Sequence, residues 1–118
     1  MKNKFSYKRG EVYKIDFSDS HFIDQEQKGN RLGVIIQNDK GNKYSSNVIV
    51  ALATSKYKGE FPTHVCLGER ISTLSTTIIM TEHIRTVSKS RLYEYVCSLD
   101  YEEMQELDKK LKVSLSLI

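Results

Sequence analysis

Two short apolar runs, each dense in valine and isoleucine, constrain the fold of this chain most strongly. They span residues 32–37 and 47–54, and the stretch between them, 38–46, is rich in turn-forming residues. Runs of this length and composition are typical of well-buried strands. We therefore expect two strands that share one core, joined by a turn or a short helical turn.

Further strands are predicted on both sides of these runs. Residues 12–17 alternate between two faces, with Tyr13, Ile15 and Phe17 on the apolar one, which indicates a half-buried strand. Shorter strands are expected at 63–67, at 77–82 with a continuation toward Thr86, and at 93–97. Residues 18–31 are polar, contain glycine and show no periodicity, so they are predicted to form a long loop of the kind that often carries function.

A helix is predicted only at 101–116. Asp100 is a good N-cap, and Glu103 stands where the second residue of a capping box belongs. Apolar residues then recur at intervals of three and four, giving a single stripe made of Met104, Leu107, Leu111 and Leu115. Several short strands followed by one helix predict an α+β, mostly β fold: an antiparallel, partly closed barrel with a C-terminal helix, built as one domain over 1–118.

The composition narrows the possible environments and partners. The chain has 118 residues, is 39% hydrophobic and carries a net charge of +3. It lacks an apolar run of ~18 residues and shows no secretory signal, so we expect no membrane span and a cytoplasmic location. The mild positive charge permits an anionic partner such as RNA or an acidic peptide. Cys66 and Cys97 are predicted to be buried free thiols, and we expect no metal and no cofactor because the cysteines and histidines are scattered.

The ends of the two apolar runs hold the candidate site. Arg31 precedes the first run, and Thr54 and Ser55 close the second. If the runs are neighbouring strands, the guanidinium and the hydroxyls meet at one rim of the sheet. A guanidinium binds two phosphate oxygens as a fork and stays charged at any relevant pH. The pattern therefore predicts a site for a phosphodiester.

A set of short segments occurs in a defined order along nearly the whole chain. The segments are Lys8–Tyr13, Glu26–Arg31, Val34–Asp39 with Gly41–Asn42, Ile49–Ala51 leading to Thr54–Ser55, Pro62–Val65, Glu82–Thr86 and Lys89–Leu92. Each segment alone is a weak signal, but the ordered set is specific, and through it the chain resembles the MazF/PemK family of toxin endoribonucleases. The resemblance implies an SH3-like plasmid-toxin barrel that forms a homodimer. It also implies sequence-selective cleavage of single-stranded RNA without a metal, and a cognate antitoxin that lays an acidic segment in the RNA groove.

The resemblance also assigns residues to roles. The catalytic arginine and threonine of the family fall on Arg31 and Thr54. Metal-free cleavage uses the neighbouring 2′-hydroxyl of the RNA and leaves a 2′,3′-cyclic phosphate and a 5′-hydroxyl, and we expect Arg31 to stabilise the charge on the phosphoryl oxygens. The residues expected to bind RNA are Glu26, Gln27, Lys28, Asn38, Ser55, Lys56, Glu82 and His83.

The chain departs from the family pattern at a few positions. Leu32 stands where the family has proline, Ser46 and Asn47 replace a Pro-Thr, and His83 replaces a glutamine. Two alternatives to an endoribonuclease stay open at this point: a non-enzymatic toxin of the same fold that poisons DNA gyrase, and a degenerate member that only binds RNA or an antitoxin. The pairing of Arg31 with Thr54 favours RNA cleavage.

Overall fold

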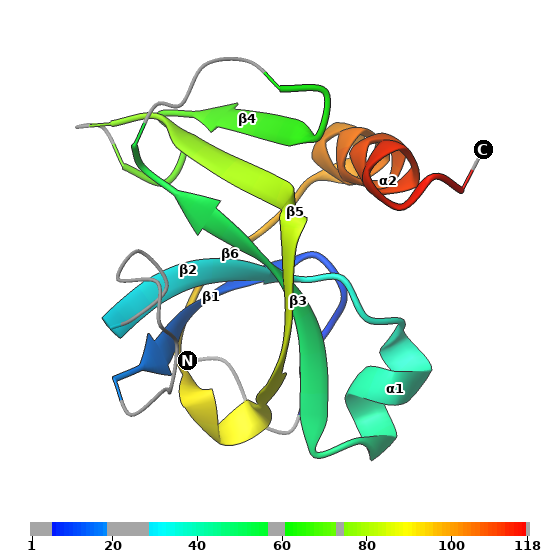
Figure 1. Cartoon of the computed structure of the whole chain (residues 1–118). Coiled ribbons are helices and arrows are strands. Elements are labelled where there is room, and N and C mark those ends of the chain that lie inside the picture. The colour runs from blue at the N-terminus through cyan, green and yellow to red at the C-terminus, as the bar shows by residue number, and fades with distance from the viewer. Residues whose placement is uncertain (1–5, 19–28, 57–60, 73–74, 118) are drawn as a thin grey trace.

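All six strands in the described part of the chain belong to one curled antiparallel sheet. The computed structural model describes residues 6–18, 29–56, 61–72 and 75–117. The strands are β1 (Glu11–Phe17), β2 (Gly29–Ile35), β3 (Asn47–Thr54), β4 (His64–Gly68), β5 (Thr77–Ser88) and β6 (Leu92–Ser98). Their order across the sheet is β4-β5-β3-β2-β1-β6, and every neighbouring pair runs antiparallel. The sheet curls around an interior, as Figure 1 shows. The predicted mostly β fold with a C-terminal helix is confirmed.

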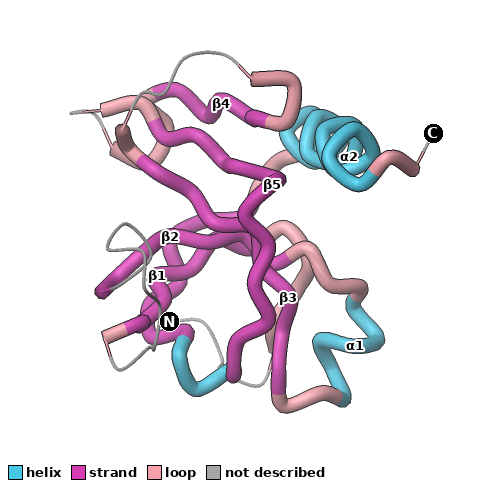
Figure 2. The backbone as a smooth tube through the Cα atoms, viewed as in Figure 1, coloured by secondary structure: helices cyan, strands magenta, loops and turns pink. Residues whose placement is uncertain are grey.

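Two helices and a short helical turn complete the described chain. Helix α1 (Asp39–Tyr44) packs against β3, α2 (Tyr101–Leu115) packs against β4 and β5, and the 3-10 turn η2 (Lys89–Arg91) joins β5 to β6. Figure 2 shows both α-helices on the outside of the curled sheet, well apart from each other. No helix among the described residues is both long enough and apolar enough to cross a bilayer.

The boundaries of β2 differ from the sequence prediction. The strand starts at Gly29, so the last residues of the predicted 18–31 loop are extended. The reason is pairing with β1, where Phe17 lies opposite Gly29 and Ile15 lies opposite Arg31. The strand ends at Ile35 rather than at 37, because Gln37 and Asn38 lead into α1. Arg31 is therefore part of a central strand, not the last residue of a loop.

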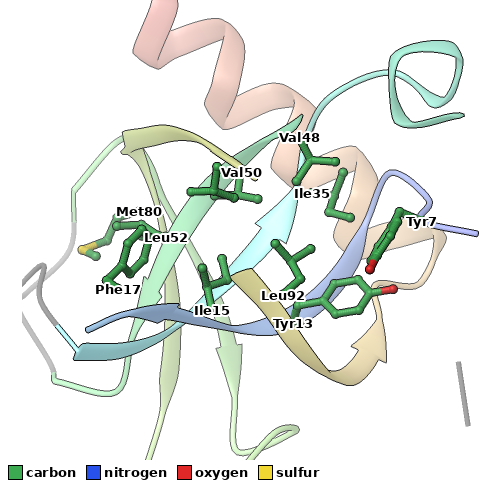
Figure 3. Packing of buried hydrophobic residues seen from close by; sticks show 11 residues of the cluster. Tyr7, Tyr13, Ile15, Phe17, Ile35, Val48, Val50, Leu52, Met80 and Leu92 are labelled. Atoms are coloured by element: carbon green, nitrogen blue, oxygen red, sulfur yellow. The ribbon is translucent and has the colours of Figure 1, made fainter. Parts of the chain in front are cut away.

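The sheet has an apolar core on each of its faces, which explains the runs of valine and isoleucine. The inner core lies within the curl and is shown in Figure 3; it consists of Tyr7, Tyr13, Ile15, Phe17, Ile35, Val48, Val50, Leu52, Met80, Val87 and Leu92. The outer core lies on the other face and includes Val12, Val34, Ala51, Ile79, Leu107 and Leu111. Consecutive residues of β2 and β3 alternate between the two cores, as side chains of a strand must.

Helix α2 begins as the sequence predicts and loses its buried face near its end. The Glu103 N–H donates to Asp100 Oδ1 at 2.8 Å, and the Asp100 N–H donates to Glu103 Oε1 at 2.8 Å, so the capping box is complete. Leu107 and Leu111 are buried, but Leu115 is 50% exposed. The predicted apolar stripe therefore contacts the sheet only over its first three turns.

Candidate functional site

The structure brings Arg31 and Thr54 to neighbouring positions at one end of β2 and β3. The register between these strands pairs Leu32 with Ala53 and Gly33 with Leu52. If this register is continued by one residue, Arg31 lies opposite Thr54. Residues opposite each other in an antiparallel pair typically have Cβ atoms about 4.5–5.5 Å apart. The two predicted catalytic residues thus meet at the rim of the sheet.

Both side chains belong to the face of the sheet that lines the inner core. A Cβ atom placed on Gly33 would lie 2.6 Å from Ile15 Cδ1 and 3.5 Å from Val50 Cβ, which are atoms of the inner core. Alternate residues of a strand share a face. Arg31 therefore lies on the same face as Gly33, and Thr54 lies on the same face as Leu52. The guanidinium and the hydroxyl stand at the mouth of the inner core.

The backbone of Arg31 is fixed by pairing instead of by a following proline. A residue before proline is held extended by steric clash, and the chain has Leu32 at that place. Leu32 is paired with Lys14 of β1 on one side and with Ala53 of β3 on the other. Because β2 lies between two partners, the ladder itself keeps Arg31 extended. The departure at Leu32 does not loosen this part of the site.

Thr54 is held tightly at the end of β3. It is only 7% exposed, and its Oγ1 accepts a hydrogen bond from the Lys56 N–H at 3.1 Å. With this acceptor position taken, the hydroxyl hydrogen is free to point elsewhere as a donor. Ser55 and Lys56, two of the predicted RNA-binding residues, follow directly and are exposed. They extend the same rim with a hydroxyl and a cation.

Among the described residues, the Arg31 guanidinium makes no hydrogen bond or ion pair. The side chain is half-buried, so it is neither a freely solvated charge nor part of a local ion pair with these residues. No described residue takes up its N–H donors, which can therefore be offered to an anion on this side. Glu26, Gln27 and Lys28, which the resemblance places in the RNA groove, lie outside the described residues.

The structure does not bring Glu82 and His83 next to Arg31 and Thr54. Thr54 is paired with Ile78 of β5, and Glu82 lies four positions further along, roughly 13 Å at ~3.3 Å per residue. The β3–β5 register steps from Ala51 opposite Ile84 to Leu52 opposite Met80. Glu82 and His83 therefore lie in a bulge of β5, between the paired residues Met80 and Ile84, and bulges of this kind re-aim side chains.

Glu82 is the centre of a polar cluster. Thr63 Oγ1 donates to Glu82 Oε1 at 2.7 Å, and Glu82 Oε2 lies 2.9 Å from His64 Nε2 and 3.8 Å from His83 Nε2. Burial by itself raises the pKa of Glu82, but the hydrogen bonds from Thr63 and His64 outweigh it and hold the pKa below its ordinary value. His64 Nδ1 is buried without a partner among the described residues. The carboxylate stays charged and fixed in place.

Asn38 has a structural function in addition to its predicted contact with RNA. Its Oδ1 accepts the Gly41 N–H at 2.7 Å and so caps α1. The neighbouring Asp39 accepts from the Arg9 N–H at 2.7 Å, and this bond, with one from Asn42, lowers the pKa of Asp39. The fully buried Asn42 also donates to the Gln37 carbonyl at 2.9 Å. The segment from Gln37 to Asn42 is thus a hydrogen-bonded turn that fixes the exit of β2.

A cavity of about 590 Å³ adjoins Arg31, and the sequence did not point to it. Its walls come from three adjacent strands and from the segment after β4; they include Lys14, Arg31, Leu32, Tyr93, Glu94 and Val96. Lys14 Nζ lies 3.3 Å from Glu94 Oε2. Tyr93, which the sequence predicts within a strand at 93–97, is the aromatic residue of this lining and is 51% exposed in the structure.

The cysteines are not placed as the sequence predicts. Cys66 is exposed on β4, and Cys97 is half-buried on β6, where Arg70 Nη1 donates to its sulfur at 3.2 Å. The prediction of burial is wrong for Cys66 because it lies on the exposed face of β4, an edge strand of the sheet. Within the described part of the chain, no group of three His, Cys, Asp or Glu side chains could hold a metal ion.

Comparison with known proteins gives one consistent family. The family described as PemK-like, MazF-like toxins of type II toxin–antitoxin systems matches residues 8–115. The curated protein "Endoribonuclease EndoA" of Bacillus subtilis (strain 168) is 41% identical over 113 residues, which are 94% of this chain and 96% of that protein.

Solved structures show the same fold at lower identity. A mycobacterial endoribonuclease in complex with its cognate antitoxin superposes with a TM-score of 0.78 at 22% identity, covering 95% of this chain and 97% of that one. MazF from Deinococcus radiodurans gives a TM-score of 0.76 at 20% identity, covering 94% and 97%. The family match and the identity to EndoA both span nearly the whole chain, and on these grounds the chain belongs to the PemK-like, MazF-like toxins of type II toxin–antitoxin systems.

Proposed function

We propose that this protein is the toxin of a type II toxin–antitoxin pair and acts as a sequence-selective endoribonuclease on single-stranded RNA. Membership of the toxin family and the name of the relative from Bacillus subtilis support the activity. The observation that carries the choice of site is the adjacency of Arg31 and Thr54 at the regular end of β2 and β3. A fixed cation and a hydroxyl side by side suit a phosphodiester.

The reaction follows from the chemistry of RNA and needs no metal. The 2′-oxygen attacks the adjacent phosphorus as its proton passes to water, and the bond from phosphorus to the 5′-oxygen breaks. The 5′-oxygen takes up a proton and leaves as a hydroxyl, while the other fragment ends in a 2′,3′-cyclic phosphate. Negative charge gathers on the phosphoryl oxygens during the reaction. Preorganised hydrogen-bond donors at those oxygens therefore contribute most to the rate.

Arg31 and Thr54 supply such donors in this proposal. The guanidinium of Arg31 offers two parallel N–H groups to the phosphoryl oxygens and stays charged throughout. The leaving 5′-oxygen takes its proton from water, so the Arg31 guanidinium keeps its charge. Thr54 adds a hydroxyl donor whose position is set by its burial and by its bond to the Lys56 N–H. Ser55 and Lys56 hold the RNA chain beyond the cleaved linkage, and Asn38, Glu82 and His83 contact it further along its path.

The partners follow from the family. We propose a cognate antitoxin that occupies the RNA-binding surface with an acidic segment, because Arg31 and Lys56 attract a peptide carboxylate as they attract a phosphate. We also propose a homodimer that acts in the cytoplasm, with Glu26, Gln27 and Lys28 facing the RNA. The relative named as an endoribonuclease and the Arg31–Thr54 pair both argue against a gyrase poison of the same fold.

The activity is tested with purified protein, a mixed pool of single-stranded RNA, and EDTA to remove divalent metals. The expected result is a set of defined fragments with 5′-hydroxyl ends, mapped by ligation that depends on prior phosphorylation. Intact RNA together with inhibited DNA supercoiling would instead identify a gyrase poison. RNA that is bound but never cut would identify a degenerate member.

The site is tested with Arg31→Ala, which is expected to lower kcat by at least about 100-fold because it removes more than one well-placed donor. Arg31→Lys, which keeps the charge but not the fork, should recover only part of this loss. Lys109→Ala, at an exposed cation on the far part of α2, serves as the control for the loss of one positive charge. Turnover of Arg31→Ala close to that of the control would refute the assignment.

A further inference from the structure

The carboxylate of Glu82 is held by two side chains from the neighbouring edge strand and its approach. Thr63 Oγ1 donates to Oε1 at 2.7 Å, and His64 Nε2 lies 2.9 Å from Oε2. Thr63 directly precedes β4, and His64 is the first residue of that strand. The Glu82 side chain is nevertheless 39% exposed. A carboxylate offers about four acceptor positions, so this fixed anion can still accept hydrogen bonds from outside the protein.

His64 is built into the protein more firmly than a surface histidine. Its side chain is only 6% exposed, and the Phe61 ring packs edge-on against it with a centroid distance of 4.8 Å. Its Nδ1 is buried without a partner among the described residues. An N–H at this place would be a buried donor with no described acceptor, which is costly, so the proton belongs on Nε2. The Nε2–H therefore donates to Glu82 from a ring whose position is set by packing.

The backbone around Glu82 is held independently of the His64 ring. Thr81, the preceding residue, is fully buried, and its N–H and its Oγ1 both donate to the Thr63 carbonyl, at 3.2 Å and 2.6 Å. Ser114 of α2 donates to the Thr81 carbonyl at 3.0 Å. Removing the Nε2 donor should therefore leave the bulge of β5 in place and free only the Glu82 side chain. Folding and side-chain orientation can thus be separated by experiment.

A fixed carboxylate discriminates between parts of an RNA chain. It repels phosphates and accepts hydrogen bonds from base N–H groups, as Glu and Asp do from the amino group of cytosine. A mobile glutamate would lose its rotamer freedom on binding, which weakens a complex. Because Thr63 and His64 already order Glu82, this entropic cost falls on folding instead. The same two hydrogen bonds keep the group ionised, in agreement with the lowered pKa of Glu82.

We propose that His64 is a positioning residue for RNA binding, which holds the Glu82 carboxylate in the orientation that accepts hydrogen bonds from base N–H groups. The inference rests on the proposed endoribonuclease and its contact between Glu82 and RNA, and it adds the residue that orients this contact. His64 acts through Glu82, because its own side chain is covered. Glu82 lies four positions along β5 from Ile78, the residue opposite Thr54, so we expect an effect on binding and not on the chemical step.

The test compares variants of His64 with a control on the same strand. His64→Leu removes the donor but keeps a side chain that fills the site, whereas His64→Gln keeps an N–H near the place of Nε2. Val65→Ala, at a residue of β4 that is 2% exposed, weakens the strand without removing a hydrogen bond to Glu82. Each variant is made in the wild-type and Glu82→Ala backgrounds, and thermal unfolding checks its folding. The values of kcat and KM are measured on a single-stranded RNA with one cleavage site.

A positioning role predicts a loss of affinity that depends on Glu82. His64→Leu should raise KM roughly 10-fold and leave kcat within about twofold, because a hydrogen bond to a charged group is lost while Thr63 still holds one oxygen. In the Glu82→Ala background, His64→Leu should change neither value. His64→Gln should restore most of the affinity, and Val65→Ala should lower thermal stability with KM unchanged. In the protein without RNA, His64→Leu should raise the pKa of Glu82, followed by NMR of its carboxyl carbon, because one of the bonds that lower it is gone.

Other outcomes overturn the proposal in distinguishable ways. If wild type cleaves the RNA and His64→Leu leaves KM unchanged, or raises it equally without Glu82, the positioning role is wrong and the activity stands. If Val65→Ala raises KM as much as His64→Leu does, the effect is one of strand stability and the positioning role is again wrong. If wild type does not cleave the RNA, the endoribonuclease proposal fails and the positioning role fails with it.

Discussion

The strands of this protein fall into a regular region and a bulged region, and the two position side chains differently. The β2–β3 ladder runs without a register shift from Ile35 opposite Val50 to Leu32 opposite Ala53. In contrast, the β3–β5 and β1–β6 ladders both contain register shifts. Continued by one residue beyond Leu32 and Ala53, the regular ladder brings Arg31 beside Thr54. The bulges place Glu82 and Tyr93 where simple alternation would not, so their positions depend on local side-chain contacts.

The largest expected effect tests the regular region through its core. Leu52 is fully buried beneath the β2–β3 ladder. Leu52→Ala should lower the free energy of unfolding by about 2–5 kcal/mol, because it removes buried methyl groups and leaves a cavity. Denaturant titration measures the change, and Leu117→Ala, at a leucine that is 67% exposed, should change it by less than about 0.5 kcal/mol. Equal effects of the two substitutions would show that this ladder is not the rigid part of the fold.

The next effect concerns the hydroxyl at the end of the ladder. Thr54→Val keeps the shape of the side chain but removes the donor, and it should lower kcat by about 100- to 1,000-fold. Thr54→Ser should keep most of the activity. Thr86→Val, the same chemical change at an exposed position of β5, is the control and should cleave RNA normally. Unchanged turnover in Thr54→Val would remove Thr54 from the site.

A smaller, pH-dependent effect is expected in the bulge of β5. The folded protein lowers the pKa of Glu82 below its ordinary value of 4.5. A carboxyl group with a lowered pKa stabilises the fold above its unfolded pKa and loses this contribution as the pH falls through the folded one. Glu82→Gln should therefore be less stable than wild type at pH 7, and the two should converge below about pH 4.5.

The measurement is the free energy of unfolding from denaturant titrations between pH 7 and pH 3. Glu69→Gln, at an exposed glutamate after β4, is the control and should follow wild type across the range. A stability difference at Glu82 that stays constant with pH would mean that its charge, and hence its bonds to Thr63 and His64, contributes nothing.

The smallest expected effect is at the exposed ion pair on β1 and β6. Glu94→Gln breaks the contact with Lys14 and should change the free energy of unfolding by no more than about 1 kcal/mol, because both groups are well solvated. The same denaturant titrations measure it. A larger loss would show that the bulged region of β6 depends on this pair for its conformation.

The difference between the two regions also explains what could be predicted from the sequence. The runs of valine and isoleucine predicted β2 and β3 because both faces of these strands are buried, and Asp100 with Glu103 predicted the start of α2 from local chemistry alone. The adjacency of Arg31 and Thr54 followed once the two strands were expected to pair. These signals are local or strictly periodic.

The bulges could not be predicted, because their cause lies in other segments. Nothing in the Tyr93–Val96 sequence reveals that β1 pairs with β6 in two different registers. Likewise, the bulge at Glu82 is supported by Thr63 and His64, which come from a separate strand and its approach. The early start of β2 at Gly29 was missed for the same reason: pairing with β1 overrides the polar, glycine-containing sequence.

The outer core has a consequence for folding during translation. Leu107 and Leu111 of α2 share this core with Val12, Val34, Ala51 and Ile79 of the sheet. Until α2 has been translated, these apolar side chains of the sheet therefore stay exposed to water. A chain that ends before α2 lacks these two leucines, and we expect it to fold poorly. We therefore expect a premature stop codon upstream of Leu107 to abolish the proposed toxicity, so a single nucleotide change could inactivate the protein.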